Sequence, residues 1–125
     1  MTPPHADILL AEDDDDLRDA MLDTLEEAGY RVVAVPNGRE ALIWLHETEH
    51  LPSLILLDLM MPVMDGWQFR EAQRGDPRAS TVPVVVLSAI GARPRIEAAD
   101  FLKKPTKAEP LIEVVSRFCG PRVAG

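Results

Sequence analysis

The sequence predicts an α/β fold, in which one five-stranded parallel sheet is doubly wound, with helices on both of its faces. Short apolar runs alternate with stretches of helical periodicity along the whole chain. The apolar runs are continuous rather than alternating, which is typical of strands that are buried on both faces. The length of 125 residues is that of one domain, and we expect a single domain over residues 1–125 with a core at about residues 6–119.

The strands are predicted at short segments rich in aliphatic, β-branched or aromatic residues. They are expected at residues 8–11, 30–35, 54–57, 82–87 and 100–103. Polar residues follow most of these runs directly, so that charged side chains are expected at the ends of the strands. Because these are parallel strands, their carboxyl ends should lie at one edge of the sheet.

The helices are predicted from apolar residues at helical spacing and from signals at their ends. They are expected at residues 15–28, from residue 37 to about residue 50, and at residues 67–74 and 109–118. Gly29 suits the end of the first helix. Asn37 with Glu40 three residues later resembles a capping box at the start of the second.

The connection between the last two strands is unusually short. It comprises the eleven residues 89–99, whereas a parallel crossover normally takes a dozen or more. Gly91 and Pro94 restrict it further, because proline is tolerated only in the first turn of a helix. We therefore predict a shortened fourth helix of about one and a half turns between Pro94 and Ala99.

The composition limits the classes of partner. The net charge of -8 argues against direct binding of nucleic acid, and no segment approaches the ~18 apolar residues of a membrane span. A cytoplasmic protein without a membrane partner is the expectation. Cys119 is the only cysteine, so that no internal disulfide can form.

Five polar residues follow the strands and are expected to meet: Glu12, Asp13, Asp58, Ser88 and Lys104. At an effective dielectric of ~20, two like charges ~4 Å apart repel by about 4 kcal/mol, so three carboxylates call for a cation. Oxygen ligands without histidine or cysteine favour Mg²⁺, with Mn²⁺ possible. Ser88 and Lys104 could then hold an anion beside the metal. The arrangement indicates phosphoryl transfer onto a carboxylate, with Asp58 as the nucleophile.

Four segments resemble the receiver domain of two-component response regulators, in order and in spacing. They are ILLAED (8–13), LILLDLMMPVMDG (54–66), VVVLSA (84–89) and DFLKKP (100–105). The resemblance implies a flavodoxin-like, CheY-like (βα)5 fold with strand order 2-1-3-4-5. It also implies a phosphorylation-dependent signalling switch rather than an enzyme that acts on an external substrate. The implied partners are a histidine kinase or phosphotransfer protein and a downstream effector protein, and the implied oligomeric state is a monomer or weak homodimer.

The resemblance also assigns roles to single residues. Asp58 would accept the phosphoryl group, and Mg²⁺ would be bound by Asp13, Asp58 and the main-chain carbonyl of Met60. Glu12 would act on the metal through water. Ser88 would move to bond the phosphoryl oxygen.

Two further residues complete the implied switch. Phe101 would follow Ser88 by changing its rotamer, and Lys104 would pair with the phosphate. The peptide bond between Lys104 and Pro105 is expected to be cis, which an X-Pro bond allows at modest cost.

Several alternatives compete with this interpretation. The acidic run could be only a solvated helix start, Ser88 an ordinary strand-end hydroxyl and Lys104 a surface lysine. An EF-hand loop starting at Asp13 would place Leu17 and Arg18 where an acidic ligand and a glycine belong. A phosphatase of the haloacid dehalogenase type would need a second acid at position 60. The main rival is a receiver-fold interaction scaffold that is regulated without phosphorylation, which the shortened crossover favours.

Overall fold

Five short strands pair in parallel in the order β2-β1-β3-β4-β5, as predicted. The computed structural model describes residues 5–89 and 94–122. The strands are β1 (Ile8–Ala11), β2 (Val32–Val35), β3 (Leu54–Asp58), β4 (Val84–Ser88) and β5 (Asp100–Lys103). The central strands β1, β3 and β4 are buried along their whole length, which explains their continuous apolar sequences.

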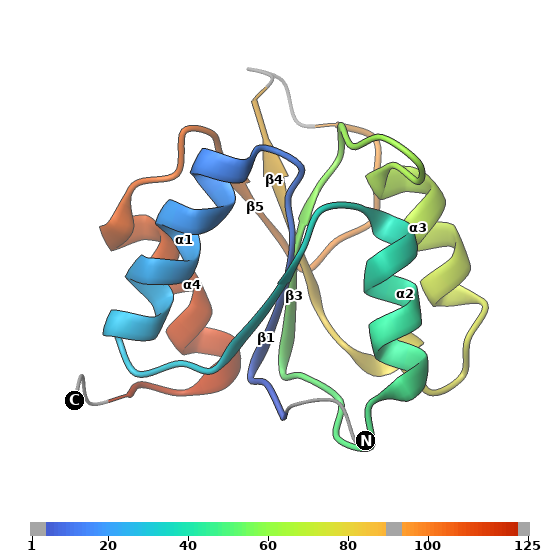
Figure 1. Ribbon diagram of the computed structural model, residues 1–125, viewed down its shortest axis with the longest axis horizontal. Coiled ribbons are helices and arrows are strands. Elements are labelled where there is room, and N and C mark those ends of the chain that lie inside the picture. Colours follow the sequence, from blue (N-terminus) through green and yellow to red (C-terminus); the bar gives the residue numbers. More distant parts are fainter. Residues whose placement is uncertain (1–4, 90–93, 123–125) are drawn as a thin grey trace.

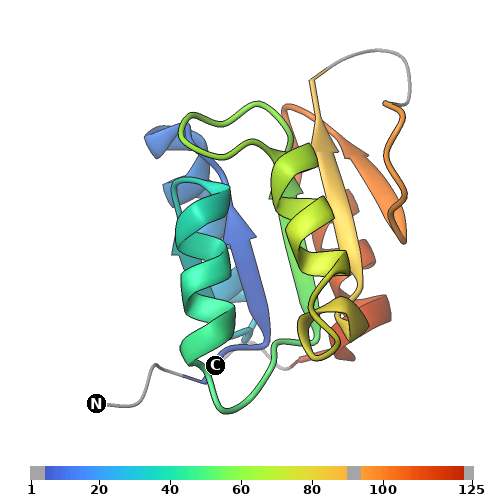
Figure 2. The same cartoon turned by 90° about the vertical axis from the view of Figure 1, so that its right-hand side faces the viewer.

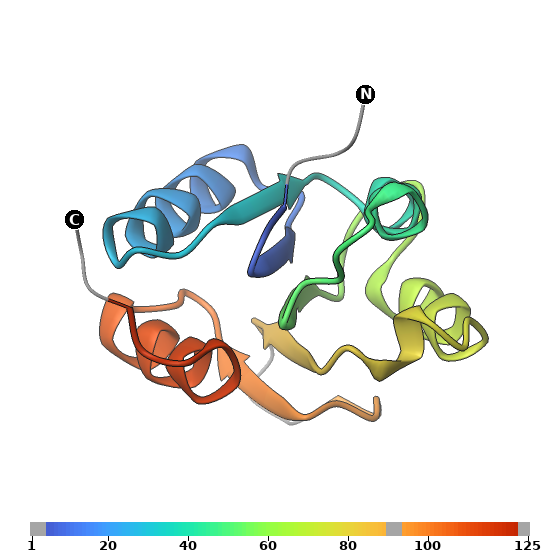
Figure 3. The same cartoon turned by 90° about the horizontal axis from the view of Figure 1, so that it is seen from below.

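Helices cover both faces of this sheet. They are α1 (Asp15–Glu27), α2 (Gly38–Glu47), α3 (Gly66–Arg74) and α4 (Ala108–Cys119), with a short 3-10 helix, η1 (Ala79–Thr81), that the sequence did not predict. Figures 1 and 3 show α1 and α4 on one face and α2 and α3 on the other, which is the doubly wound arrangement. Within the described ranges, no helix combines the length and the apolar character needed to cross a bilayer.

Two apolar clusters, one on each face, hold the layers together. Alternate residues of each strand point to opposite faces, so that Ile55 packs towards Phe69 of α3 whereas Leu56 packs towards Met21 of α1. All three strands that make up the centre therefore contribute to both clusters. A one-residue slip of β3 against β1 would exchange the two faces, which fixes the register of Leu9 with Ile55.

Short polar side chains cap the starts of α1, α2 and α3, whereas α4 has no side-chain cap. Asn37 Oδ1 accepts a hydrogen bond from the Glu40 backbone N–H at 3.0 Å, which confirms the predicted N-cap of α2. The complete reciprocal capping box lies instead at α3. There Asp65 accepts from the Gln68 backbone N–H at 2.9 Å, and the Gln68 side chain accepts from the Asp65 backbone N–H at 3.0 Å.

The crossover from β4 to β5 departs from the prediction. Residues 94–99 contain no helix, so the expected one and a half turns between Pro94 and Ala99 are wrong. The physical reason is the length of this segment, which must return along the full sheet: Ala99 N–H already bonds Val84 O at 2.8 Å, at the start of β4. Ile96 and Ala98 pack against the core in place of a helix.

Figure 2 shows the segment of residues 94–99 beside the sheet, in orange. Gly91 lies outside the described residues.

Candidate functional site

The predicted residues meet at the carboxyl edge of the sheet. Glu12 follows β1, Asp58 ends β3, Ser88 ends β4 and Lys104 follows β5. The backbone N–H of Lys104 donates to Ser88 O at 2.8 Å, which ties the ends of β4 and β5 together. A cavity of about 270 Å³ opens here. Its lining residues are Asp13, Asp14, Asp58, Leu59, Met60, Leu87, Ser88, Ala89 and Lys104.

Three carboxylates meet beside this cavity, as the sequence predicted, and two of them, Asp13 and Asp58, line it. Glu12, Asp13 and Asp58 each place one oxygen within 4.8 Å of those of the other two. Asp13 is exposed, whereas Glu12 is fully buried and Asp58 retains only 3% of its accessible surface. Burial of two of these three charges raises the free energy of the site unless cations compensate them.

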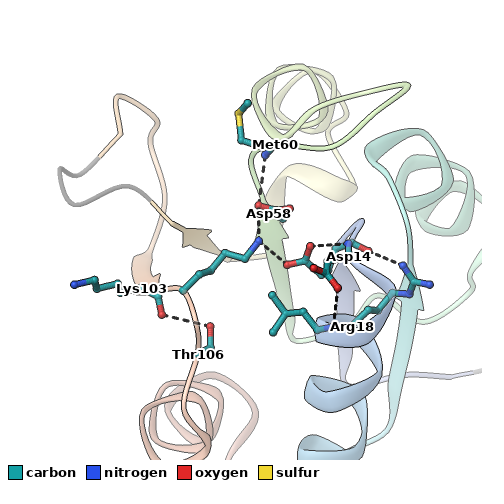
Figure 4. A network of polar contacts seen from close by, with 9 residues as sticks. Asp14, Arg18, Asp58, Met60, Lys103 and Thr106 are labelled. Atoms are coloured by element: carbon teal, nitrogen blue, oxygen red, sulfur yellow. Dashed lines mark hydrogen bonds and ion pairs between the residues drawn. The ribbon is translucent and has the colours of Figure 1, made fainter.

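The loop after β1 holds Glu12 in place from two sides. Its Oε2 accepts a hydrogen bond from the Asp14 backbone N–H at 3.0 Å, and its carbonyl accepts from Arg18 Nη1 at 2.9 Å. Asp14 in turn caps α1 by accepting from the Leu17 backbone N–H. Figure 4 shows how Asp14 and Arg18 enclose this turn. The acidic run thus divides into site residues and helix-start residues, with Asp15 and Asp16 in the first turn of α1.

Lys104 is the cation that the structure places in this site. Its Nζ lies 2.8 Å from Glu12 Oε1 and 3.2 Å from Asp58 Oδ1. Burial lowers the pKa of Lys104, but the bonds and charges of Glu12 and Asp58 outweigh this effect and raise it overall. Lys104 therefore carries a fixed positive charge between the two buried carboxylates.

One lysine does not neutralise this site. Burial, then the charge of Glu12 and the contact with Asp13, raise the pKa of Asp58 to about 7, and the charge of Lys104 offsets them only in part. Asp58 Oδ1 also accepts a long bond, 3.4 Å, from the Met60 backbone N–H (Figure 4). Asp58 Oδ2 is buried and has no hydrogen-bond partner among the described residues. A buried acceptor without a partner, beside two other carboxylates, fits an oxygen-ligated divalent cation.

The remaining predicted residues surround this centre. Ser88 lines the cavity and is 8% exposed. Phe101 is half-buried and packs against the cluster under α2 and α3. The cis peptide bond between Lys104 and Pro105 is confirmed. The use of the Met60 carbonyl as a metal ligand stays a prediction.

The loop from β3 to α3 passes very close to Asp58. The Gly66 backbone N–H bonds Leu59 O at 2.9 Å, and a Cβ on Gly66 would lie 2.7 Å from Asp58 O. Only glycine allows this approach. Val63, in the same loop, has φ = 70°, in the left-handed region that β-branched residues disfavour. The Asp65–Gly66 pair is a turn signal in the sequence, but no local pattern indicates the left-handed conformation of Val63.

Replacing Val63 by asparagine is expected to raise the free energy of unfolding by about 1 kcal/mol, because asparagine tolerates the left-handed conformation. Val63 is 71% exposed, so little apolar burial is lost. Urea unfolding measures the change. Val63→Thr is the control, since threonine keeps the branched Cβ and should give no gain. Equal stabilities of the two variants would contradict strain at this position.

One known protein family matches most of this chain. The model of the response regulator receiver domain family matches residues 8–116, which is most of the chain. The chain belongs to this family. It is therefore a signalling domain of two-component systems.

Other receiver proteins resemble the chain over most of its length. It is 36% identical over 115 residues to the response regulator receiver protein CpdR of Brucella abortus, covering 89% of this chain and 94% of CpdR. It is equally identical, 36% over 115 residues, to the response regulator Rre1 of Synechocystis sp., covering 86% of this chain but only 49% of that longer protein. Its relatives thus include a protein of about the same length and a much longer one.

A solved receiver domain shows what the fold can hold. The receiver domain of sensor histidine kinase PA1611 from Pseudomonas aeruginosa superposes with a TM-score of 0.83 at 27% identity, covering 94% of this chain and 99% of that one. That structure has a magnesium ion coordinated in its active site cleft.

Proposed function

We propose that this receiver domain is a phosphorylation-dependent signalling switch in which Asp58 accepts the phosphoryl group. The proposal rests on the surroundings of the Asp58 carboxylate. It lines a cavity, one of its oxygens has no partner among the described residues, and two more carboxylates and a lysine surround it. A carboxylate held in this way is available as a nucleophile.

The transfer is an in-line displacement at phosphorus. An Asp58 oxygen forms the new P–O bond while the P–N bond to a phosphohistidine breaks, and the departing imidazole takes up a proton. Asp58 must be ionised to attack, and Lys104 favours that form by its charge. Glu12, Asp13, Asp58 and the Met60 carbonyl would hold Mg²⁺, with Mn²⁺ as a possible substitute. Bound there, the ion would neutralise the carboxylates and the phosphoryl oxygens.

The residues beside Asp58 would detect the product. Lys104 would exchange its contact with Asp58 for the new phosphoryl oxygens, and Ser88 would donate its hydroxyl to one of them. Phe101 lies one strand away from Ser88 and is only half-buried, so that its side chain has room to follow. We propose a histidine kinase or phosphotransfer protein as the phosphodonor and a protein as the effector, without direct binding of nucleic acid.

Incubation with acetyl phosphate and Mg²⁺, followed by intact-protein mass measurement, tests this function. We expect a mass gain of one phosphoryl group, lost in Asp58→Asn and on removal of Mg²⁺ by a chelator. Asp23→Asn is the matched control, since Asp23 is an exposed carboxylate of α1 and should leave the gain intact.

A second candidate is a receiver-fold scaffold regulated without phosphorylation. The crossover favours it, because residues 94–99 form no helix between the site and β5. Absence of a mass gain with acetyl phosphate and with a phosphohistidine donor would support the scaffold. A gain that persists in Asp58→Asn would contradict Asp58 as the acceptor.

A further inference from the structure

A second cavity, of about 620 Å³, lies between α3 and the segment of residues 95–97. It shares no lining residue with the cavity at Asp58. It borders the crossover where residues 94–99 pass α3 as an extended segment rather than as a helix (Figure 2). The groove therefore borders the crossover, whose path differs from the predicted fourth helix.

The two walls of the groove are fixed to each other. Trp67 Nε1 donates to Arg95 O at 3.3 Å, and Arg70 Nε donates to Glu97 O at 3.0 Å. Arg70 Nη1 also donates to Gln73 Oε1 at 3.0 Å, on the same helix. Side chains of α3 therefore hold the backbone of the extended segment, and the groove exists before any ligand binds.

The groove has an excess of positive charge. Arg70, Arg74 and Arg95 line it, against Glu71 and Glu97, whereas the whole chain has a net charge of -8. The ion pair of Arg74 with Glu97 is long, at 3.7 Å. Within residues 5–89 and 94–122, the Arg95 side chain has no ion pair.

The arginines of α3 also repel each other. Arg70 and Arg74 are four residues apart on one face of the helix, a spacing at which like charges destabilise. Burial, and next the charge of Arg74, lower the pKa of Arg70, and Glu97 opposes this shift only in part. An added anion would relieve this repulsion.

The groove also offers an apolar contact. Trp67 is 38% exposed at the edge of the groove, whereas Trp44, the other tryptophan, lies on the buried face of α2. Tryptophan and arginine are the residues most enriched where binding energy concentrates in protein interfaces. Guanidinium groups bind carboxylates in a bidentate manner, which a side chain of glutamate or aspartate can satisfy.

We propose that this groove binds an acidic segment of a partner protein, whose carboxylates pair with Arg74 and Arg95 while an apolar side chain packs on Trp67. The site goes beyond phosphorylation of Asp58 and does not depend on it. A basic segment would meet like charge here.

NMR of the two tryptophan indole N–H signals tests the proposal. The probe is an acetylated, amidated peptide Glu-Glu-Leu-Glu-Glu, added to the ¹⁵N-labelled full chain. We expect a saturable shift of the Trp67 signal and none of the Trp44 signal. The matched peptide Lys-Lys-Leu-Lys-Lys should shift neither. Added salt should weaken the binding, because exposed charge pairs are screened.

Charge-reversing variants locate the site. Arg74→Glu and Arg95→Glu should each weaken binding by about tenfold, since each replaces an attraction by a repulsion. Both residues are exposed, and the dispersion of the spectra verifies that the variants fold. Arg39→Glu on α2 changes the net charge equally at an exposed position that does not line the groove, and should weaken binding by less than about twofold.

Four results would overturn the proposal. The Trp67 signal could show no saturable shift, or Arg39→Glu could weaken binding as much as the groove variants, which would indicate non-specific attraction. Inorganic phosphate alone could reproduce the shift, which would indicate a small-anion site. A Trp67 shift that depends on protein concentration without peptide would assign the groove to a second copy of the chain.

Discussion

Lys104→Met is expected to lower the free energy of unfolding at pH 8 by about 3 kcal/mol, measured by urea unfolding without divalent cations. The substitution keeps the length of the side chain but removes the charge that lies 2.8 Å from Glu12 Oε1 and 3.2 Å from Asp58 Oδ1. Two buried carboxylates would then face each other without compensation. The loss should shrink as the pH is lowered, because protonation of Asp58 removes one of the charges.

The neighbouring lysine provides the control. Lys103 is exposed, so that Lys103→Met should change the stability by less than about 0.5 kcal/mol. The double variant Glu12→Gln with Lys104→Met should recover much of the loss, because the charge that Lys104 balances is removed as well. Similar losses for the Lys103 and Lys104 variants would show that the buried carboxylates do not need this cation.

Asp58→Asn is expected to raise the free energy of unfolding by about 2 kcal/mol at pH 8 and by nothing measurable at pH 4. Burial and the charge of Glu12 raise the pKa of Asp58 to about 7, above the value of about 3.9 in an unfolded chain. The folded protein therefore binds more protons than the unfolded chain between these two values. Its stability falls as the pH rises from about 4 to about 7, and the deficit is complete above pH 7. Asparagine at this position cannot ionise, so the variant does not lose this stability as the pH rises.

Addition of Mg²⁺ and a surface variant test whether ionic repulsion at Asp58 causes the gain in stability. Saturating Mg²⁺ should stabilise the unmodified protein at pH 8, because only the folded chain assembles the three carboxylates. It should stabilise Asp58→Asn much less, since one charged ligand is gone. Asp23→Asn should show no pH-dependent gain, because Asp23 is exposed. A gain in Asp58→Asn that is equal at pH 4 and pH 8 would contradict ionic repulsion as its cause.

Local patterns were enough for most of the fold. The run Val84–Ser88 is buried on both sides, and its composition shows this directly. The site could be predicted for a related reason: residues that end parallel strands meet at one edge whatever the details of packing. The positions of Glu12, Asp58 and Lys104 at or just after strand ends were therefore enough to predict that these residues meet.

Interactions between segments far apart in the chain could not be predicted from local patterns. Arg78, in the loop after α3, donates to Leu45 O at 2.8 Å and to Thr48 O, and so caps the end of α2 from at least thirty positions away. The extended path of residues 94–99 depends on contacts of the same kind, with Trp67 and Arg70. No local pattern in the sequence indicates these partners.

The sequence by itself determined the five strands and the four α-helices in their order along the chain, and it predicted which residues would meet at the strand ends, because hydrophobic periodicity and strand ends are local properties. Only the tertiary structure decided how charge is distributed there. It placed Lys104 between Glu12 and Asp58, left Asp58 Oδ2 without a partner among the described residues, and laid the crossover against the arginines of α3. These features depend on distances between segments far apart in the chain, and electrostatic free energy follows distance and burial rather than sequence position.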